Sequence, residues 1–178
     1  MVIKTLRQIG DPVLSVPARV VTEIGETKIK KIVRDLKESL HFHQLIGLAA
    51  PQIGVGIKIF VTEIYETETR KREDSDKLRV YINPRIVWQS KKEAEIWEGC
   101  GSVAHSDIFA PVIRPASLRV RAQNEKGQEF ELKAKGLLAR VILHEYDHLL
   151  GIHFLEKVTE PKRIMDKSHY LKQIVGIK

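Results

Sequence analysis

The sequence is poor in features that would cross-link the chain or place it in a membrane. Its 178 residues include one cysteine, Cys100, so no disulfide can form within the chain. No stretch approaches the roughly 20 consecutive apolar residues of a membrane-spanning helix, and the first residues lack the apolar core of a signal peptide. We therefore expect no membrane association and a cytoplasmic location, with a mature organellar form as the alternative.

Internal repeats, low-complexity segments and interdomain linkers are also missing. A chain of this length is expected to form a single domain, residues 1–178, that buries a core without staples. Hydrophobic residues make up 43% and charged residues 30%, proportions that argue against disorder. The net charge of +7 suits a polyanionic partner such as RNA, although a basic surface is also common without one.

Periodic apolar residues predict a helix within residues 27–43. Its apolar positions are Ile29, Ile32, Val33, Leu36 and Leu40. Residues 47–56 are too rich in glycine and proline for a regular element, whereas residues 57–65 have the β-branched and aromatic content of a strand. The charged run at residues 66–77 is expected to be an exposed loop.

Short strands are predicted at residues 79–88, 117–123 and 128–134. The last two are joined across residues 124–127, where Gly127 suits the left-handed position of a hairpin. A second helix is predicted at residues 135–151, ended by a glycine. Its apolar positions are Leu137, Leu138, Val141, Ile142 and Leu149. The basic segment 157–178 predicts a last helix after Pro161 that includes Ile164, Met165 and Leu171.

The second helix contains the pentapeptide HEYDH at residues 144–148. Residues i and i+4 project from one helix face, so His144 and His148 can bind one cation, and Glu145 beside them can act as a base toward bound water. Two histidines that are merely hydrogen-bonded in the core are the alternative. A metal needs at least a third ligand, which could be another histidine, an acid or Cys100.

Cys100 lies between two glycines that let the backbone approach a ligand closely. A lone buried cysteine is usually an inert small hydrophobe. Beside two imidazoles, however, a thiolate would leave a fourth tetrahedral position open for water, as in catalytic sites. The metal would lower the pKa of that water toward neutrality.

Three motifs, GLAAPQ (47–52), EGCGS (98–102) and HEYDH (144–148), resemble in order and spacing those of the peptide deformylases. The flanking stretches GDPVL (10–14) and INPRI (82–86) are also similar to that family. The resemblance implies a metal-dependent hydrolase that removes the N-formyl group from the initiator N-formylmethionine of nascent polypeptides and releases formate.

The resemblance also implies the site residues. One divalent metal ion, most often Fe2+, would be held by Cys100, His144 and His148, and Zn2+, Ni2+ or Co2+ also suit this ligand set. Gln52 and the backbone N–H of Gly101 would donate hydrogen bonds to the developing oxyanion. Glu145 would be the general base toward water and then the general acid toward the departing amine.

The substrate-binding residues are expected close to these motifs. Ile46, Gly47, Val141 and Leu137 are candidates for the wall of an apolar methionine pocket, with ordinary core packing as the alternative. Glu98 is counted among the substrate-binding candidates. Glu98 and Asp147 are also candidates for orienting the metal ligands or for pairing with an arginine such as Arg114. A surface salt bridge is the alternative for both acids.

The combined pattern predicts an α+β fold with antiparallel or mixed sheets around a central HExxH helix, and with N-terminal and C-terminal helices. An HExxH metallopeptidase is disfavoured because such enzymes generally take their third ligand downstream, whereas Cys100 lies upstream of the helix.

The chain departs from the family pattern at two positions. Leu45 replaces the usual first glycine of the first motif, and Gly101 replaces a leucine of the second. The alternative function is therefore a deformylase-like metal-binding protein with an altered substrate or no catalysis. The basic C-terminal segment resembles a helix that docks some members on ribosomal RNA, and a solvated helix face is its alternative. Its candidate phosphate contacts are Lys162, Arg163, Lys167 and Lys172.

Overall fold

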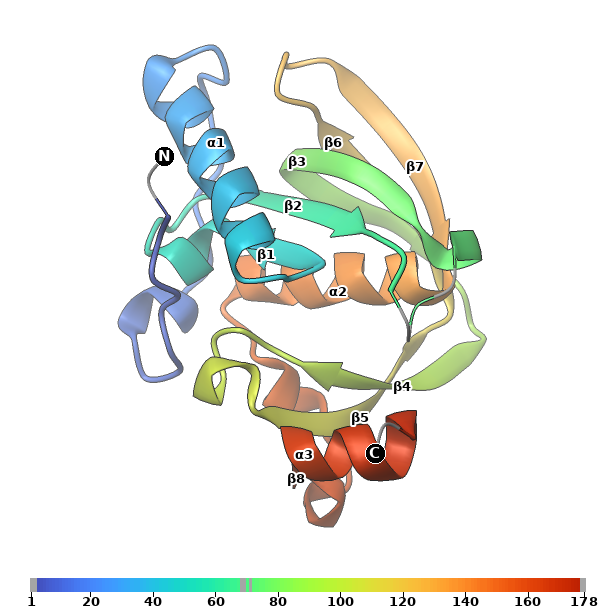
Figure 1. Ribbon diagram of the computed structural model, residues 1–178. Helices are drawn as coiled ribbons and strands as arrows, with labels where there is room; N and C mark the ends of the chain where they lie inside the picture. Colours follow the sequence, from blue (N-terminus) through green and yellow to red (C-terminus); the bar gives the residue numbers. More distant parts are fainter. Residues whose placement is uncertain (1–2, 68–69, 71, 177–178) are drawn as a thin grey trace.

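The larger of two β-sheets has five strands and an antiparallel order. The structure, a computed structural model, describes residues 3–67, 70 and 72–176. The strands run β1–β2–β3–β6–β7 across the sheet (Figure 1). Their bounds are β1 Gly47–Ala49, β2 Ile59–Ile64, β3 Asp76–Gln89, β6 Ser117–Gln123 and β7 Glu129–Lys135.

The smaller sheet has the order β4–β5–β8 and lies on the other side of the central helix. Its strands are β4 (Glu93–Gly99), β5 (Ile108–Pro115) and β8 (Met165–Asp166), and the helix is α2 (Gly136–Leu150). Helix α2 contacts β1 and β2 of the larger sheet and β5 of the smaller one. The predicted α+β arrangement around the HExxH helix is confirmed.

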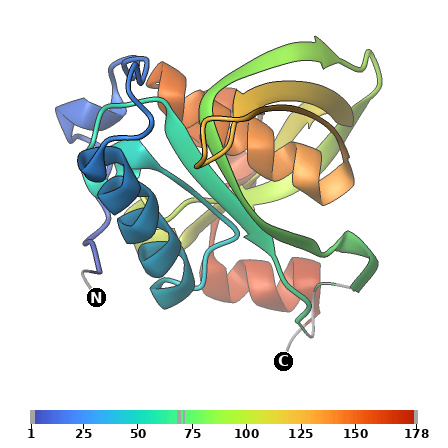
Figure 2. The same ribbon diagram turned by 90° about the horizontal axis from the view of Figure 1, so that it is seen from above.

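Helix α1 (Thr27–Phe42) covers one face of the β1–β2 region and α2 covers the other (Figure 2). Strand residues therefore alternate between two cores. Leu48 and Ile59 pack with the apolar face of α1, whereas Ala49 and Phe60 pack with α2. This alternation is the period of two expected for a strand that is buried on both faces. The predicted helix at residues 27–43 is confirmed.

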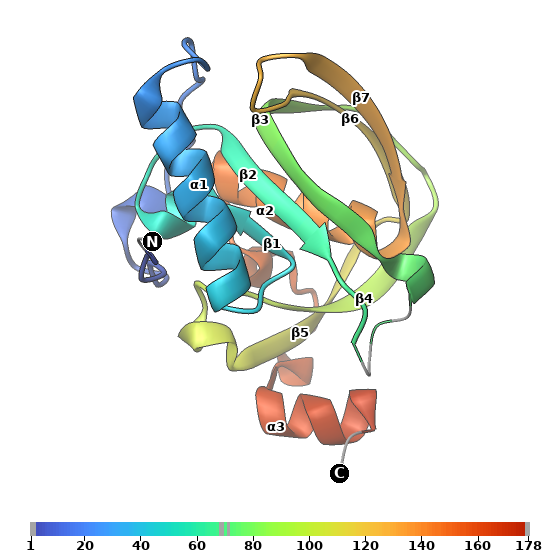
Figure 3. The same ribbon diagram turned by 45° about the horizontal axis from the view of Figure 1, so that its top comes forward.

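The chain ends with α3 (Lys167–Tyr170) and one turn of π-helix (Leu171–Val175), which lie beside β5 and away from the larger sheet (Figure 3). Tyr170 stacks on Phe109 of β5 with ring centroids 4.2 Å apart. A C-terminal helix is present as predicted, but it begins later in the sequence than expected and does not include Ile164 or Met165. Met165 pairs with Phe109 in the small sheet, and the helix begins only after Asp166, whose side chain accepts from two backbone N–H groups.

Two other predictions differ from the structure. Residues 47–56 are not irregular throughout, because the backbone of β1 pairs with β2 despite its glycine. Strand β3 begins at Asp76, inside the charged run that was expected to be a loop. The predicted hairpin is confirmed, with Gly127 at φ 77°.

The remaining elements are single turns of 3-10 helix: Pro12–Leu14, Ala50–Ile53, Arg72–Asp74, Ala104–Ser106, Phe154–Lys157 and Pro161–Arg163. In the described part of the chain, no helix is both long and apolar enough to cross a membrane.

Candidate metal centre

Helix α2 presents His144 and His148 on one face, with their ring centroids 5.1 Å apart. The opposite side of the helix packs on the larger sheet through residues such as Ile142 and Leu149, so the histidine face points toward the smaller sheet. The helix ends at Gly151, whose φ of 76° is the left-handed conformation of a C-terminal cap. Both histidines are buried.

Cys100 follows the last residue of β4 and reaches the same point from the other layer. Its Sγ lies 3.2 Å from His148 Nε2, and the ligand atoms of Cys100, His144 and His148 all lie within 4.8 Å of one another. In a tetrahedral zinc site, metal–ligand lengths of about 2.0–2.3 Å place a sulfur and a nitrogen about 3.5 Å apart. The three side chains therefore fit a single divalent cation.

A buried carboxylate fixes the orientation of His144. Nδ1 of this histidine donates to Glu98 Oε2 at 2.8 Å, which leaves Nε2 for a metal. Glu98 also accepts from Arg114 Nε at 2.7 Å and from Arg140 at 2.7 Å. Burial raises the pKa of Glu98, but the hydrogen bonds and charges of His144 and Arg114 outweigh this effect and hold the pKa well below its ordinary range.

The same network includes Asp147, the second acid that was predicted to pair with an arginine. Arg114 donates to Asp147 at 2.5 Å, so Glu98 and Asp147 share one buried arginine. Sequence reasoning missed Arg140, which also donates to the backbone carbonyls of Ala94 and Val112. Its signal was available, because Arg140 lies four residues before His144 on the same helix face.

Glu145 lies beside the three candidate ligands. Its side chain is buried, and Oε2 has no hydrogen-bond partner among the described residues. Burial raises the pKa of Glu145 to about 7, and the nearby charge of His144 opposes the rise. A carboxylate with a pKa near neutrality can both accept and return a proton at physiological pH. Burial also lowers the pKa of His148 well below its ordinary value, which favours the neutral imidazole that binds metals.

Gly47 lets Glu145 take this position. A Cβ at residue 47 would lie 2.4 Å from Glu145 Oε1 and 2.7 Å from Val141 Cγ1, so only glycine fits here. Gly47, Val141 and Glu145 are thus brought together. Ile46 and Leu137 are half-buried, and their part in a methionine pocket stays a prediction.

Gln52 lies on the single turn that follows β1, with its amide orientation fixed by a hydrogen bond. Oε1 accepts from the backbone N–H of Ala49 at 2.8 Å, so Nε2 points toward Cys100 Sγ, 3.6 Å away, and Ser102 Oγ, 3.3 Å away. Ser102, to which no role was assigned from sequence, also donates its backbone N–H to Cys100 Sγ at 3.4 Å. The amide donor of Gln52 therefore lies next to the candidate ligand set.

The two departures from the family pattern lie against each other in space. A Cβ at Gly101 would lie 2.7 Å from Leu6 Cδ1 and 3.3 Å from Leu45 Cδ1. The side chains of Leu6 and Leu45 thus cover the position that a side chain at residue 101 would use. His105 and Asp107, in the segment that follows Cys100, are exposed.

A thiolate and two imidazoles around one point, with an unpaired carboxylate beside them, define the class of mononuclear metal-dependent hydrolases. Residues 3–164 match the family model of polypeptide deformylase. Peptide deformylase 1 of Ralstonia nicotianae is 40% identical over 178 residues, covering 97% of this chain and 99% of that protein. The peptide deformylase of Pseudothermotoga lettingae is 39% identical over 161 residues, covering 90% and 86%.

A solved structure agrees with this assignment. The crystal structure of peptide deformylase from Ehrlichia chaffeensis in complex with actinonin has a TM-score of 0.81, with 34% identity and 92% of each chain covered. The chain belongs to the polypeptide deformylase family.

Proposed function

We propose that Cys100, His144 and His148 hold one divalent metal ion, Fe2+ in the cell, and that the site hydrolyses the formyl amide of N-formylmethionyl nascent chains. The observation that carries this proposal is the convergence of three ligand atoms within 4.8 Å next to a carboxylate oxygen without a partner. Zn2+, Ni2+ and Co2+ suit the same ligands, and the ion that occupies the site depends on metal availability as much as on affinity.

Each side chain around the metal has a separate task. A divalent ion supplies Lewis acidity, which polarises a carbonyl and makes water a stronger acid. Glu145 takes the proton from the attacking water and passes it to the departing amine, for which its pKa of about 7 is suited. Glu98 holds His144 in the tautomer that keeps Nε2 free.

Gln52 and Gly101 stabilise the oxyanion by donating hydrogen bonds to it. The charge that develops on the formyl oxygen needs donors that are already in place. Gln52 Nε2 is held in place by the bond from Ala49 N–H to Oε1, and the backbone N–H of Gly101 follows the ligand Cys100 directly. A glycine retains this N–H, so the departure at residue 101 removes no donor.

The methionine side chain is assigned to the wall near Gly47. Val141 is buried against Gly47, and we assign Ile46 and Leu137 to the same wall because Ile46 precedes Gly47 and Leu137 lies four residues before Val141 on α2. Glu98 acts on the site indirectly, because its carboxylate accepts a hydrogen bond from His144 and fixes the orientation of that ring. The Ehrlichia deformylase was solved in complex with actinonin, and actinonin is expected to bind at this site as well.

Formate release tests the activity. The protein is purified without oxygen, reconstituted separately with iron, nickel or zinc, and assayed with formyl-Met-Ala-Ser. Glu145→Gln is expected to retain the metal and lose turnover, whereas Cys100→Ala is expected to lose both. Full metal occupancy without formate release from the wild-type protein would refute the deformylase reading and favour the non-catalytic alternative.

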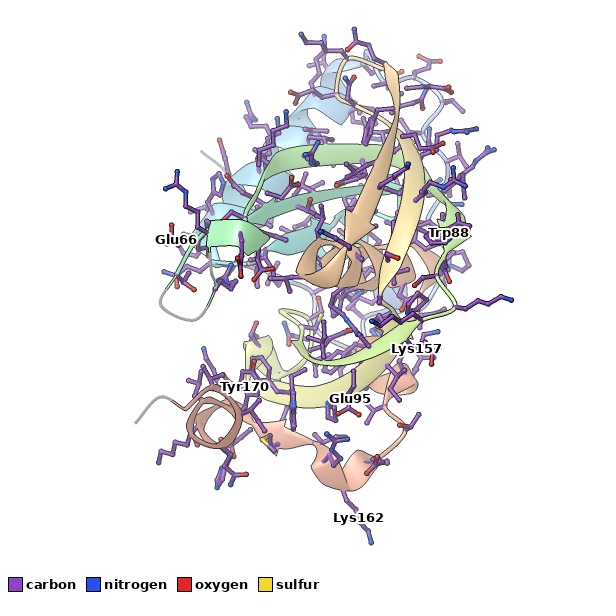
Figure 4. The ribbon with its side chains drawn as sticks, turned by 90° about the vertical axis from the view of Figure 1, so that its right-hand side faces the viewer. Glu66, Trp88, Glu95, Lys157, Lys162 and Tyr170 are labelled. Atoms are coloured by element: carbon purple, nitrogen blue, oxygen red, sulfur yellow. The ribbon has the colours of Figure 1, made fainter. Side chains whose placement is uncertain are left out.

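We also propose that the basic C-terminal segment docks on ribosomal RNA, which would place the enzyme where nascent chains are made, in the cytosol or, for an organellar form, inside the organelle. Lys162, Lys167 and Lys172 are exposed, and Lys162 points away from the body of the molecule (Figure 4). Arg163 contributes less, because it is already paired with Glu95 at 2.7 Å.

The ribosome test uses substitutions, because truncation would also remove β8 and the Tyr170 stack. Replacing Lys162, Lys167 and Lys172 with glutamate is expected to abolish salt-dependent cosedimentation with ribosomes while formate release persists. Unchanged cosedimentation of this triple variant would reject docking through the segment.

A further inference from the structure

The outer face of the larger sheet carries a band of cations around an exposed tryptophan. We call it the basic sheet face. It consists of Arg85 and Trp88 on β3, Arg119 and Arg121 on β6, and Lys133 and Lys135 on β7. The intervening residues, such as Val120 and Ala134, point inward and pack with the core beneath α2. The basic sheet face therefore points away from α2 and from the metal centre that α2 carries.

Trp88 is the aromatic element of this face. It is 46% exposed, and Figure 4 shows it at the outside of the molecule. The guanidinium of Arg119, its cross-strand neighbour, lies 5.9 Å from the indole ring centroid. An indole that is held beside a cation and open to solvent is a platform on which a further flat group can stack.

Like charges meet at two pairs of opposed positions on this face, whereas Arg121 also lies opposite the oppositely charged Glu131. Arg85 lies directly opposite Arg121, and Arg119 lies directly opposite Lys133. Like charges at opposed positions of neighbouring strands destabilise a sheet. An anion lying across the two like-charged pairs would relieve their repulsion, so this part of the face suits an anionic partner.

Carboxylates neutralise only part of this charge. Glu131 pairs with Arg119 at 3.4 Å and with Arg121 at 3.0 Å. Arg85, Lys133 and Lys135 are exposed, and among the residues that the structure describes they form no ion pair. Three cations thus remain available around the tryptophan.

We propose that the basic sheet face binds single-stranded RNA, with one base stacked on Trp88 and phosphates bound by Arg85, Lys133 and Lys135. Unpaired bases offer the flat surface that an indole binds, and a sheet face with aromatic and cationic side chains matches the way single strands are recognised. The choice of RNA over DNA rests on the proposed function, because an enzyme that acts on nascent chains works beside the RNA of the ribosome.

The test is fluorescence anisotropy with a labelled oligouridine of 12 nucleotides and the full-length, metal-loaded protein. Trp88→Ala is expected to weaken binding about 10-fold or more, the loss of one stacked base, and Trp88→Phe is expected to restore most of it. The double variant Arg85→Glu with Lys133→Glu is expected to lower the salt slope, d log K/d log[salt], by about 1.4 in magnitude, because each single-strand phosphate contact contributes about 0.7.

A matched control carries the same change of charge on α1, with Lys28→Glu and Lys31→Glu, both exposed in the wild type. An equal loss of binding in this control, undiminished binding by Trp88→Ala, or equal competition by polyglutamate would overturn the proposal. Formate release measured on the same samples separates the two functions, since the sheet-face variants are expected to keep it. Equal affinity for the deoxy oligonucleotide would overturn the choice of RNA.

Discussion

Replacing Glu145 with glutamine is expected to stabilise the metal-free protein at alkaline pH, although the same change should abolish turnover. Burial raises the pKa of this carboxyl from 4.5 to about 7. The folded chain thus holds a proton that the unfolded chain has already released, so Glu145 lowers the free energy of unfolding as pH rises from about 4.5 to about 7. Above that range the full penalty applies.

The size of the penalty follows from the shift. A change of about 2.5 pKa units at about 1.4 kcal/mol per unit amounts to about 3 kcal/mol at pH 8. At pH 5 most of the penalty is absent, and it falls to about 1 kcal/mol or less. Glutamine cannot ionise, so the variant avoids the cost, and its Tm at pH 8 is expected to exceed that of the wild type by roughly 6–12 °C.

Thermal unfolding of chelator-treated wild type and Glu145→Gln at pH 5, 6, 7 and 8 measures this difference directly. All other titrating groups are shared, so they cancel in the comparison. A stability difference that does not change with pH, or a wild type that is more stable at pH 8, would show that Glu145 is not held in a desolvated site.

Further substitutions probe the packing around the site. Leu45→Gly and Gly101→Leu are each expected to lower the free energy of unfolding, by about 1–3 kcal/mol for the latter, and the double variant to recover only part of the loss in chemical denaturation, because Leu6 Cδ1 would still lie 2.7 Å from the added Cβ. Strictly additive losses would mean that the two side chains do not share one space. Gly47→Ala is expected to reduce formate release at least about 100-fold with metal retained, because its methyl displaces Glu145; near-normal turnover would contradict this. Glu98→Ala is expected to cost about 3–5 kcal/mol because the buried Arg114 and Arg140 lose the carboxylate that both contact, and a smaller loss in urea denaturation would show that water replaces the carboxylate.

Periodicity and motif spacing predicted the elements that carry the histidines, but not the sheet that carries the cysteine. Strand β4 buries Glu98 on its inner side, which hides the usual alternation of polar and apolar residues. Strand β5 contains Pro111 and Pro115, which argue against a strand interior. The prolines are tolerated because β8 pairs with β5 only at Ile108 and Phe109, so beyond these residues one side of β5 is an edge.

In the candidate site, too, the features set by local sequence were predictable and those set by long-range contacts were not. The ligand set could be read from three short motifs, since each encodes its own turn or helix face. The network that joins Glu98, Arg114 and Arg140 could not, because it depends on the approach of β4, β5 and α2, which no local pattern specifies. The proximity of Leu45 to Gly101 also appears only once the chain has folded.

The position of Cys100 gives the metal a role in holding the chain together. The cysteine and His148 are 48 residues apart in sequence, and the chain between them forms β5, β6, β7 and most of α2. A cation bound to both closes a loop of that length, a constraint whose entropic benefit grows with loop size. The ion would thus act as a reversible cross-link between the smaller sheet and the central helix, in a chain whose one cysteine has no thiol partner for a disulfide.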